Sequence, residues 1–328
     1  MEKGSLPSLC LVTLNEEMMK KRMLISVTLV IILSSCIVKP TPEKQKPETE
    51  YSVSLKRDVL IMMLAYPEFV KGVELIESEP YLIMKSGLKI LYDDALVKTP
   101  DQKLENADIQ DMLSQIYPMS DVTGIMEKDV DPGRYRSYAF FSDVYGDTKE
   151  LTYANTVKVT YGTQSLRFTK INQADLTFKA AADRVFGLAK SDVSLLDYIS
   201  PSSGTYNYRV ISGTQILSMH SYGIALDMHY NAQDYWQWAD PIKAKERIIN
   251  YPKSIVHAYE ENMFIWGGKW NHFDTVHYEY RPEIILKALY FSSQINITKP
   301  WSTGVDASNP TIKALIEQID LSLKNLKP

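Results

Sequence analysis

Between residues 151 and 300, short strand-like runs and helical segments follow one another without the regular strand–helix–strand alternation of a parallel sheet. The runs Asn155–Tyr161 and Ser165–Ile171 surround Gly162, and a helix capped by Asn172 is expected after them. This irregular order favours the α+β class, with a small, mostly antiparallel sheet and flanking helices. Further strands are predicted at Asn207–Ser212, Gly223–His229, Met263–Trp266 and Thr275–Tyr280, and a further helix at Pro252–Asn262.

Residues 51–150 are predicted to form a separate accessory region of mixed α/β structure. A helix is expected over Asp58–Glu74, with an interruption at Pro67, because proline cannot continue a helical hydrogen-bond ladder. A hairpin is expected to turn at Gly87. Another helix is expected over Asn106–Tyr117, with the asparagine as its cap. No motif in this region indicates a particular chemistry.

The first 50 residues have the composition of an export leader followed by a tether. The basic residues 20–22 precede an apolar run of about 13 residues, which is shorter than the ~20 that span a membrane. Residues 33–36, Leu-Ser-Ser-Cys, resemble a bacterial lipobox, which predicts removal of residues 1–35 and lipid attachment to Cys36. The alternative is a plain secretory signal with an incidental cysteine. Translation is expected to begin at Met18, Met19 or Met23.

Residues 36–50 are predicted to be the lipidated cysteine and a linker. The stretch Lys39–Glu50 has three prolines and no apolar residue, so burial cannot offset its ordering entropy. A multiply acylated Cys36 would be a firm anchor. We therefore expect a protein of the cell envelope, lipid-anchored to a bacterial membrane on its extracytoplasmic side.

Composition excludes several classes of protein. The chain of 328 residues is 45% hydrophobic and 23% charged, which is ordinary for a globular protein. Its 36 basic and 40 acidic residues give a net charge of −4, so nucleic acid is not expected as a partner. Both cysteines lie within the first 36 residues, which excludes a disulfide framework in the remainder. After the accessory region, we expect a second domain at residues 151–300 and a helical tail at residues 301–328.

All five histidines lie between residues 220 and 277, near several aspartates. His220 and Asp227 can converge if Gly223 lets the chain turn back between them. Nitrogen and oxygen donors together suit Zn²⁺, which takes three protein ligands in catalytic sites and keeps a fourth position open. On spacing alone, the third ligand is either His229, at i+2 from the aspartate, or His277, from a separate strand.

Three motifs occur in order over residues 206–281. Residues 218–227, SMHSYGIALD, match the pattern S-x-H-x-x-G-x-A-x-D, and residues 274–279, DTVHYE, place an acid three residues before a histidine. Residues 266–270, WGGKW, match W-G-G-x-W. The first two motifs resemble those of the zinc D-alanyl-D-alanine carboxypeptidases of the VanY and VanX type, in peptidase family M15. The third resembles the subgroup that includes L-alanyl-D-glutamate endopeptidases of phage endolysins.

The resemblance implies a hedgehog/DD-peptidase-like fold and zinc as the cofactor, with His220, Asp227 and His277 as ligands. It places the catalytic acid/base on Asp274, where many family members have Glu and the endolysin-like subgroup has Asp. It also implies that Arg209 polarises the scissile carbonyl or holds a substrate carboxylate. The alternative for Arg209 is an ordinary ion pair.

The remaining polar and aromatic residues near the motifs have supporting interpretations. Ser218 is expected to bond the backbone of the ligand loop, and Glu279 to accept a hydrogen bond from a ligand imidazole. Trp266 and Trp270 are expected to pack at the edge of the cleft or to contact substrate. After the turn at residues 131–133, two arginines either contact an anionic ligand or are solvated. These arginines are Arg134 and Arg136. His229 and His272 are expected to be neighbours of the site, and His257 to be a solvated partner of Glu260 and Glu261.

The combined prediction is a monomeric zinc peptidase that hydrolyses peptidoglycan stem peptides. A D-alanyl-D-alanine carboxypeptidase is the first choice, and an L-alanyl-D-glutamate endopeptidase is the alternative. A lipoprotein of the same fold that binds the cell wall without cleaving it is a rival of another class. A serine carboxypeptidase requires S-x-x-K together with S-D-N and K-T-G, and only the first occurs, at Ser86–Lys89.

Overall fold

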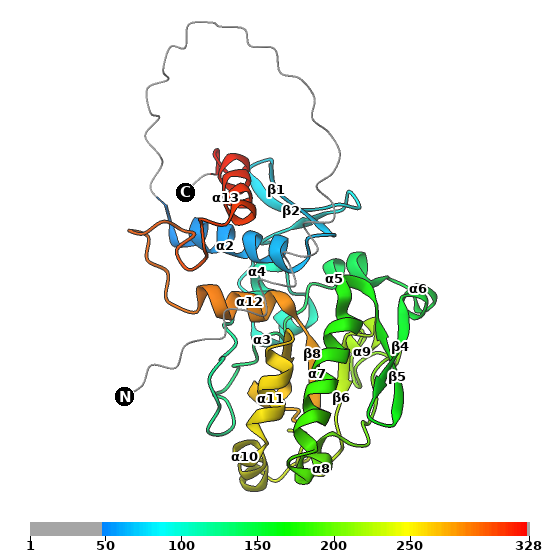
Figure 1. Ribbon diagram of the computed structural model, residues 1–328. Coiled ribbons are helices and arrows are strands. Elements are labelled where there is room, and N and C mark those ends of the chain that lie inside the picture. Colours follow the sequence, from blue (N-terminus) through cyan, green and yellow to red (C-terminus); the bar gives the residue numbers. More distant parts are fainter. Residues whose placement is uncertain (1–47, 327–328) are drawn as a thin grey trace, which may run out of the picture. The chain divides into compact units, whose positions relative to one another are not determined.

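Helices and small antiparallel sheets make up the part of the chain that this computed structural model describes, residues 48–326 (Figure 1). The described strands form two three-stranded sheets and one two-stranded sheet, and every strand pair in them is antiparallel. These features confirm the predicted α+β class with antiparallel strands.

The first described helix, α2 (Glu50–Ala65), begins at the Thr49 cap, whose hydroxyl accepts a backbone hydrogen bond. It ends before Pro67, and the chain then enters a strand, because proline lacks the amide that a continuing helix needs. The predicted helix to Glu74 is therefore wrong beyond the proline, whereas the hairpin at Gly87 is confirmed. The first sheet comprises β1 (Val70–Ile76), β2 (Glu79–Met84) and β3 (Lys89–Leu91).

Short helices follow the first sheet. Asn106 lies at the end of α3 (Pro100–Glu105), not at the start of a helix. The next helix, α4 (Ile109–Met112), is capped by Asp108, whose carboxylate accepts a hydrogen bond from a backbone amide of the helix (2.7 Å). The expected cap at Asn106 is wrong because Asp108 satisfies that amide instead. Two further helices are α5 (Tyr138–Tyr145) and α6 (Lys149–Ala154).

The predicted hairpin around Gly162 is confirmed, with β4 (Thr156–Tyr161) paired to β5 (Gln164–Thr169). The helix after it, α7 (Ala174–Ala189), is also confirmed, but Asn172 does not cap it. The backbone of Asn172 is left-handed (φ 52°), and its side chain donates a hydrogen bond to a carbonyl of α2 (2.9 Å). A tertiary contact thus replaces the local cap. Short elements nearby are η1 (Ile171–Gln173), η2 (Val193–Leu195) and α8 (Leu196–Ile199).

The third sheet comprises β6 (Ala225–Asp227), β8 (His277–Tyr280) and β7 (Phe264–Trp266), with β8 in the middle. All four residues of β8 are buried. The strands of residues 151–300 therefore form two sheets, not one. The expected strand at Asn207–Ser212 is wrong, since only Val210 of that segment forms a β-bridge. The helical elements of this part are α9 (Met219–Tyr222), α10 (Pro241–Asn250), α11 (Lys253–Glu260) and η3 (Gly267–Lys269).

The last two helices, α12 (Pro282–Phe291) and α13 (Pro310–Ser322), pack against α2, and α13 also contacts β1 (Figure 1). Lys287 of α12 lies 2.6 Å from the Asp58 carboxylate, and the Tyr66 hydroxyl donates a hydrogen bond to Glu283 (2.7 Å). Residues from the beginning and the end of the described chain thus share one core.

The predicted domain boundaries at residues 150 and 300 stay predictions. The leader, Cys36 and most of the linker lie outside the described residues. Within residues 48–326, no helix has both the length and the apolar character that crossing a membrane requires.

Candidate metal and catalytic site

The chain turns back at Gly223 and brings His220 to Asp227. His220 lies in α9, whose first turn is capped by Ser218, and α9 ends at Gly223 with a left-handed backbone (φ 71°). That conformation favours glycine, and the chain passes directly from it into β6, which ends at Asp227. His220 Nε2 consequently lies 3.2 Å from Asp227 Oδ2.

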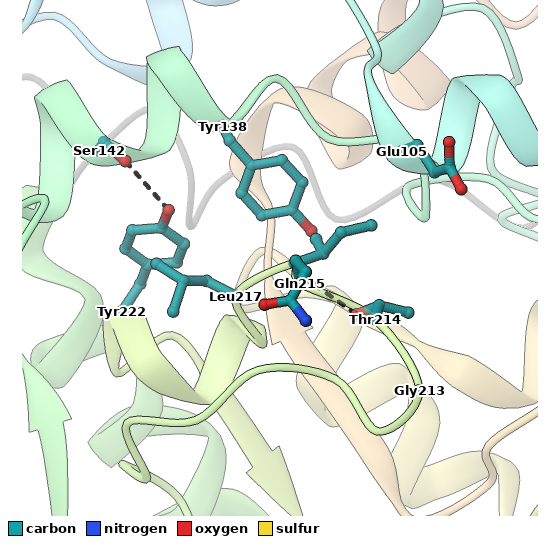
Figure 2. Close-up of a pocket in the computed structure, with 9 residues that line it drawn as sticks. Glu105, Tyr138, Ser142, Gly213, Thr214, Gln215, Leu217 and Tyr222 are labelled. Carbon is teal, nitrogen blue, oxygen red and sulfur yellow. Dashed lines mark hydrogen bonds between the residues drawn. The ribbon is translucent and has the colours of Figure 1, made fainter.

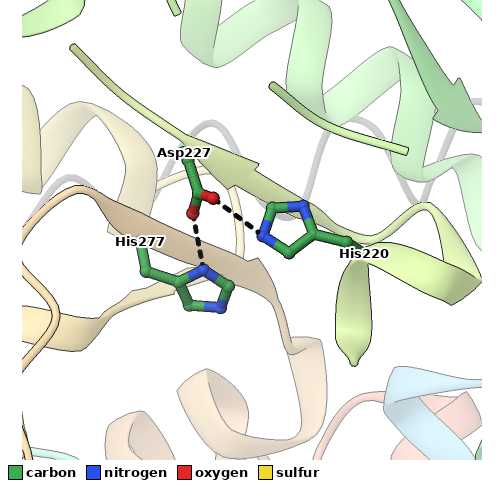
Figure 3. A group of neighbouring side chains, drawn as sticks. All are labelled: His220, Asp227 and His277. Carbon is green, nitrogen blue, oxygen red and sulfur yellow. Dashed lines mark hydrogen bonds and ion pairs between the residues drawn. The ribbon is translucent and has the colours of Figure 1, made fainter. Parts of the chain in front are cut away.

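The strand register brings a second histidine to the same carboxylate. Asp227 at the end of β6 is directly opposite His277 at the start of β8. His277 Nδ1 lies 2.8 Å from Asp227 Oδ1, so the aspartate is placed between two imidazoles (Figure 3). His229 is elsewhere, with its Nδ1 donating to the Pro201 carbonyl (3.2 Å). Because β6 ends at Asp227, His229 does not continue the face of that strand.

Each imidazole has one ring nitrogen held by a hydrogen-bond acceptor and the other directed at Asp227. His220 Nδ1 donates to the Thr205 carbonyl (2.5 Å), which leaves the Nε2 lone pair on the aspartate side. His277 Nε2 donates to Glu279 Oε1 (3.0 Å), which leaves Nδ1 on that side. A partner on the distal nitrogen is how metal-ligating histidines are oriented in proteins.

These three side chains fit a zinc ion. Their donor atoms, two nitrogens and one oxygen, all lie within 4.8 Å of one another. His220 Nε2 is buried and makes no hydrogen bond, which is costly for a polar atom unless another partner satisfies it. A cation bound by the three residues would be that partner. Two imidazoles and a carboxylate are a donor set typical of catalytic zinc, with a fourth position left for water or substrate.

Asp227 and His277 each shift the pKa of the other. Burial lowers the pKa of His277, but Asp227 and Glu279 outweigh it and raise that pKa to about 10. Burial raises the pKa of Asp227, but His220 and His277 outweigh it and hold the pKa well below its usual range. Without a metal, His277 is therefore an imidazolium between two carboxylates, and its Nδ1 proton lies on the side where a metal would bind.

Zinc binding is accordingly expected to release about one proton per ion at pH 7 to 8, because His277 Nδ1 must lose its proton to become a ligand. The pKa is raised, so the proton is held below about pH 10, and affinity should increase about tenfold per pH unit in this range. Titration calorimetry in buffers of different ionisation enthalpy measures the release. A binding enthalpy independent of the buffer would contradict the expectation.

Glu279 connects the cluster to two arginines. Its side chain is fully buried and forms ion pairs with Arg136 and with Arg281 Nη1 (3.2 Å), in addition to the hydrogen bond from His277. Burial raises the pKa of Glu279, but Arg136 and His277 outweigh it and keep the carboxyl ionised. Arg136 comes from the predicted accessory region, so that region contributes a residue to the environment of the cluster.

Asp274 lies in the turn that leads into β8. Its carbonyl accepts a hydrogen bond from the His277 amide (3.1 Å), which closes the turn, and its Oδ1 is buried without a hydrogen bond. Burial, with Asp227 and Asp234, raises the pKa of Asp274 to about 7, while His277 and Arg134 act in the opposite direction. A carboxyl with a pKa near neutrality can both accept and return a proton at physiological pH.

The first glycine of the W-G-G-x-W segment, Gly267, has no room for a side chain. A Cβ at Gly267 would lie 2.4 Å from the Asp274 carbonyl oxygen and 3.0 Å from the Trp270 ring. The Asp274 amide donates to the Gly267 carbonyl (3.1 Å), so the two backbones are in direct contact. The absence of a side chain at Gly267 thus allows the turn that carries Asp274 to pack directly against the Gly267 backbone.

The substitution Gly267→Ala is expected to displace Asp274 and lower kcat about 10²-fold, since an ångström-scale shift of a catalytic group has that effect. Unfolding free energy should fall by about 1–3 kcal/mol through overpacking. The control is Gly187→Ala in α7, where a Cβ meets nothing within 4 Å. Kinetics and thermal unfolding of both variants measure the effects. Wild-type kcat in Gly267→Ala would contradict this role.

Sequence reasoning missed Asp234. This buried carboxylate accepts hydrogen bonds from the Thr275 hydroxyl (2.5 Å) and from Arg247 Nε (2.9 Å), and its carbonyl accepts from the Thr275 amide (2.8 Å). Thr275 lies between Asp274 and His277, so Asp234 holds the turn that joins them. Only the polar turn before Asp234 marks this position in the sequence, and nothing there indicates the distant partners.

Three other predicted site residues lie as follows. The Arg209 side chain is exposed, and no ion pair includes it within the described chain, while its backbone bonds the loop of Ser218. Trp266 is buried, with Nε1 donating to the Thr275 carbonyl (2.8 Å). The Trp270 ring lies 5.8 Å from the His277 ring, centroid to centroid. Their roles toward substrate stay predictions.

The other two histidines have partners outside the cluster. His272 Nδ1 lies 2.7 Å from Asp131 Oδ2. His257 Nε2 lies 2.8 Å from Asp121 Oδ1, so the expected pairing with Glu260 and Glu261 is wrong. Those glutamates have cationic partners already, Lys269 (2.6 Å) and Arg184 respectively.

A cavity of about 680 Å³ adjoins α9 (Figure 2). Tyr222, two residues after His220, lines it and shares a hydrogen bond with Ser142 of α5 (3.1 Å). Tyr138 and residues 213–217 line it as well, and none of the three clustered ligand candidates does. Its volume is in the range of pockets that hold small ligands.

Comparison with known protein families gives a match over part of the chain. A family model of the M15 peptidases, described as D-alanyl-D-alanine carboxypeptidase, matches residues 212–280. No curated protein and no solved structure matches the chain. The match supports a peptidase of that family, and hence a hydrolase. Peptidases of the family are generally zinc-dependent, and the matched segment contains the whole His220–Asp227–His277 cluster together with Asp274.

Proposed function

We propose that this protein is a zinc peptidase that hydrolyses peptidoglycan stem peptides, most specifically a D-alanyl-D-alanine carboxypeptidase. The supporting observation is the arrangement of two imidazoles around Asp227, each oriented by an acceptor on its other nitrogen. Asp274, a buried carboxyl with its pKa raised to about 7, lies in the adjoining turn. The matched family description names the same activity. A hedgehog/DD-peptidase-like fold for residues 151–300 belongs to the same proposal.

In this proposal each residue has a defined task. Zinc held by His220, Asp227 and His277 would supply Lewis acidity to the scissile carbonyl and to a water molecule. Asp274 accepts a proton from the attacking water and returns it to the departing amine. Glu279 and the Thr205 carbonyl keep the imidazoles in the orientation that directs their free nitrogens inward. No covalent intermediate with the protein is required.

An L-alanyl-D-glutamate endopeptidase is the second candidate. The contact between Gly267 and the Asp274 backbone favours it, because the W-G-G-x-W segment and the Asp both resemble the endolysin-like subgroup. The two candidates use the same chemistry on different bonds of one stem peptide. They differ in which amine departs.

Mass spectrometry of defined muropeptides, incubated with zinc-loaded protein, distinguishes these activities. The protein should begin at residue 48, because Glu48 and Thr49 both bond Ser52 at the start of α2. Loss of one D-Ala from a pentapeptide stem is the expected result. Cleavage between L-Ala and D-Glu with D-Ala intact would favour the second candidate. Binding of zinc and wall fragments without any cleavage would leave a non-catalytic wall-binding lipoprotein.

We also expect lipid attachment at Cys36, with the protein held at the outer face of a bacterial membrane. The substitution Cys36→Ala should abolish incorporation of a labelled fatty acid and release or stall the protein, because the acylated residue is removed. Metabolic labelling and membrane fractionation measure both effects. Unchanged membrane retention with an unchanged processed mass would contradict the lipobox interpretation.

A further inference from the structure

Arg134 and the candidate ligand His277 both lie near the Trp270 ring, although Arg134 comes from the predicted accessory region. Its guanidinium carbon is 5.7 Å from the centroid of the Trp270 ring, and that ring lies 5.8 Å from the His277 ring. The turn before Arg134 is attached to the same tryptophan, since Trp270 Nε1 donates to the Pro132 carbonyl (2.8 Å). The positive charge also acts on Asp274, whose pKa it lowers against the effect of burial.

The hydrogen-bonding capacity of Arg134 is little used inside the protein. Its Nη1 is buried without a hydrogen bond, and the nearest carboxylate oxygen, on Asp131, is 3.6 Å away. Asp131 already accepts hydrogen bonds from the backbone amide and Nδ1 of His272 (2.9 and 2.7 Å). A guanidinium offers five donors, and 21% of this side chain remains exposed to solvent.

Other arginines near the cluster are less suited to a ligand. Arg136 and Arg281 are both paired with Glu279, and Arg281 also with Glu283 (2.5 Å). Arg209 is exposed, and its contacts to the site are made by its backbone. Arg136 Nε and Arg281 Nη2 are also buried without a hydrogen bond, but the side chains of these two arginines are only 8% and 0% exposed. Within the described chain, Arg134 is therefore the cation at the site that combines an unused donor with exposure to an incoming anion.

We propose that Arg134 binds the α-carboxylate of the residue that leaves with the scissile nitrogen. This proposal rests on the peptidase function above and names the substrate class: N-acyl amino acids with a free α-carboxylate next to the cleaved amide. Planar guanidinium and carboxylate groups form paired, charge-assisted hydrogen bonds. Arg134 is thus a specificity residue supplied from outside the motif-bearing segment.

Both candidate bonds present this carboxylate. In a stem that ends in D-Ala-D-Ala, the departing D-Ala is the terminal residue and its α-carboxylate is free. In a stem with γ-linked D-Glu, the chain continues from the side-chain carboxyl, so the α-carboxylate of the D-Glu acylated by L-Ala is also free. An ordinary α-linked chain has a neutral amide at that place. Binding of this carboxylate by Arg134 therefore favours substrates with either of these bonds over peptides in which the chain continues through the α-carboxyl group.

The test compares each carboxylate substrate with its carboxamide. The two pairs are an acylated D-Ala-D-Ala peptide with its C-terminal amide, and an L-Ala-γ-D-Glu peptide with its D-isoglutamine analogue. Wild-type protein should prefer the carboxylate in kcat/KM by roughly 10- to 100-fold, the usual contribution of a hydrogen bond to a charged group. Arg134→Gln should remove this preference by lowering only the carboxylate rate, and Arg134→Lys should restore part of it. Whichever pair is cleaved identifies the source of the carboxylate.

A matched control is Arg184→Gln, since Arg184 is a half-exposed surface residue paired with Glu261. It should leave both rates unchanged. Equal loss on carboxylate and carboxamide in Arg134→Gln, or a retained preference, would overturn the proposal. Zinc content and thermal unfolding of each variant identify a folding defect.

A binding measurement keeps the inference independent of turnover. Calorimetry with N-acetyl-D-Ala-D-Ala, N-acetyl-L-Ala-γ-D-Glu and their carboxamides is performed on Asp274→Asn protein, with and without Arg134→Gln. A carboxylate preference of roughly 10-fold or more that depends on Arg134 supports the proposal even if no peptide is cleaved, in which case only the peptidase function fails. Absence of the preference for both probes overturns the Arg134 assignment even if peptides are cleaved.

Discussion

Replacing His220, Asp227 or His277 by Ala, one at a time, is expected to remove most of the bound zinc and lower turnover by about 10³-fold or more. Each substitution leaves two protein ligands where a catalytic zinc site uses three. His277→Ala also leaves Asp227 and Glu279 without the imidazolium that separates them in the metal-free protein. Metal analysis and turnover on the cleaved muropeptide measure the effect, and circular dichroism verifies the fold.

His229→Ala is the control for this series. It is two residues from Asp227, but its ring bonds the Pro201 carbonyl outside the cluster. Zinc content and turnover should stay near wild type. If His229→Ala lost the metal and His277→Ala kept it, the third ligand would have been assigned to the wrong residue.

Asp274→Asn is expected to lower kcat by about 10²- to 10⁴-fold, the usual contribution of general acid–base catalysis, while zinc stays bound. Asparagine keeps the size of the side chain and cannot accept the proton. In wild type, activity should fall as pH decreases through the pKa of Asp274, because the protonated acid is no longer a base. That pKa is about 7 without metal, and a nearby cation lowers it, so the acidic limb should lie at or below about pH 7.

The pH–rate profile and metal content of Asp274→Asn test this role beside Asp183→Asn. Asp183 is a surface carboxylate paired with Lys179 in α7, so its amide variant should behave as wild type. Wild-type turnover in Asp274→Asn would remove the residue from the mechanism. Loss of zinc would instead make Asp274 a ligand.

The sequence correctly predicted those elements that depend only on residues close together in the chain. The hairpins at Gly87 and Gly162 and the helix α11 are confirmed because turn glycines and apolar periodicity act over a few residues. The choice between His229 and His277 as partner of Asp227 was open, because it depends on the register of strands 50 residues apart. In the structure, β6 ends at Asp227, and the opposite position in β8 is His277.

Two predicted caps were wrong for one physical reason. Asparagine is equally suited to a helix start, a helix end and a left-handed turn, so its neighbours decide. The cap of α4 is Asp108 and not Asn106, and the side chain of Asn172 bonds a carbonyl of α2 instead of capping α7. The pairing of Arg136 with Glu279, 143 residues apart, follows from tertiary packing and has no local signal.

The contacts of α2 with the C-terminal segment determine when this protein can finish folding. Arg57 donates a hydrogen bond to the Trp301 carbonyl, 244 residues later, and Asp58 and Tyr66 meet Lys287 and Glu283 of α12. The first described helix therefore cannot complete its contacts before Trp301 has been synthesised. Contacts so distant in sequence slow folding. A nascent chain would stay incompletely folded until those residues have been synthesised.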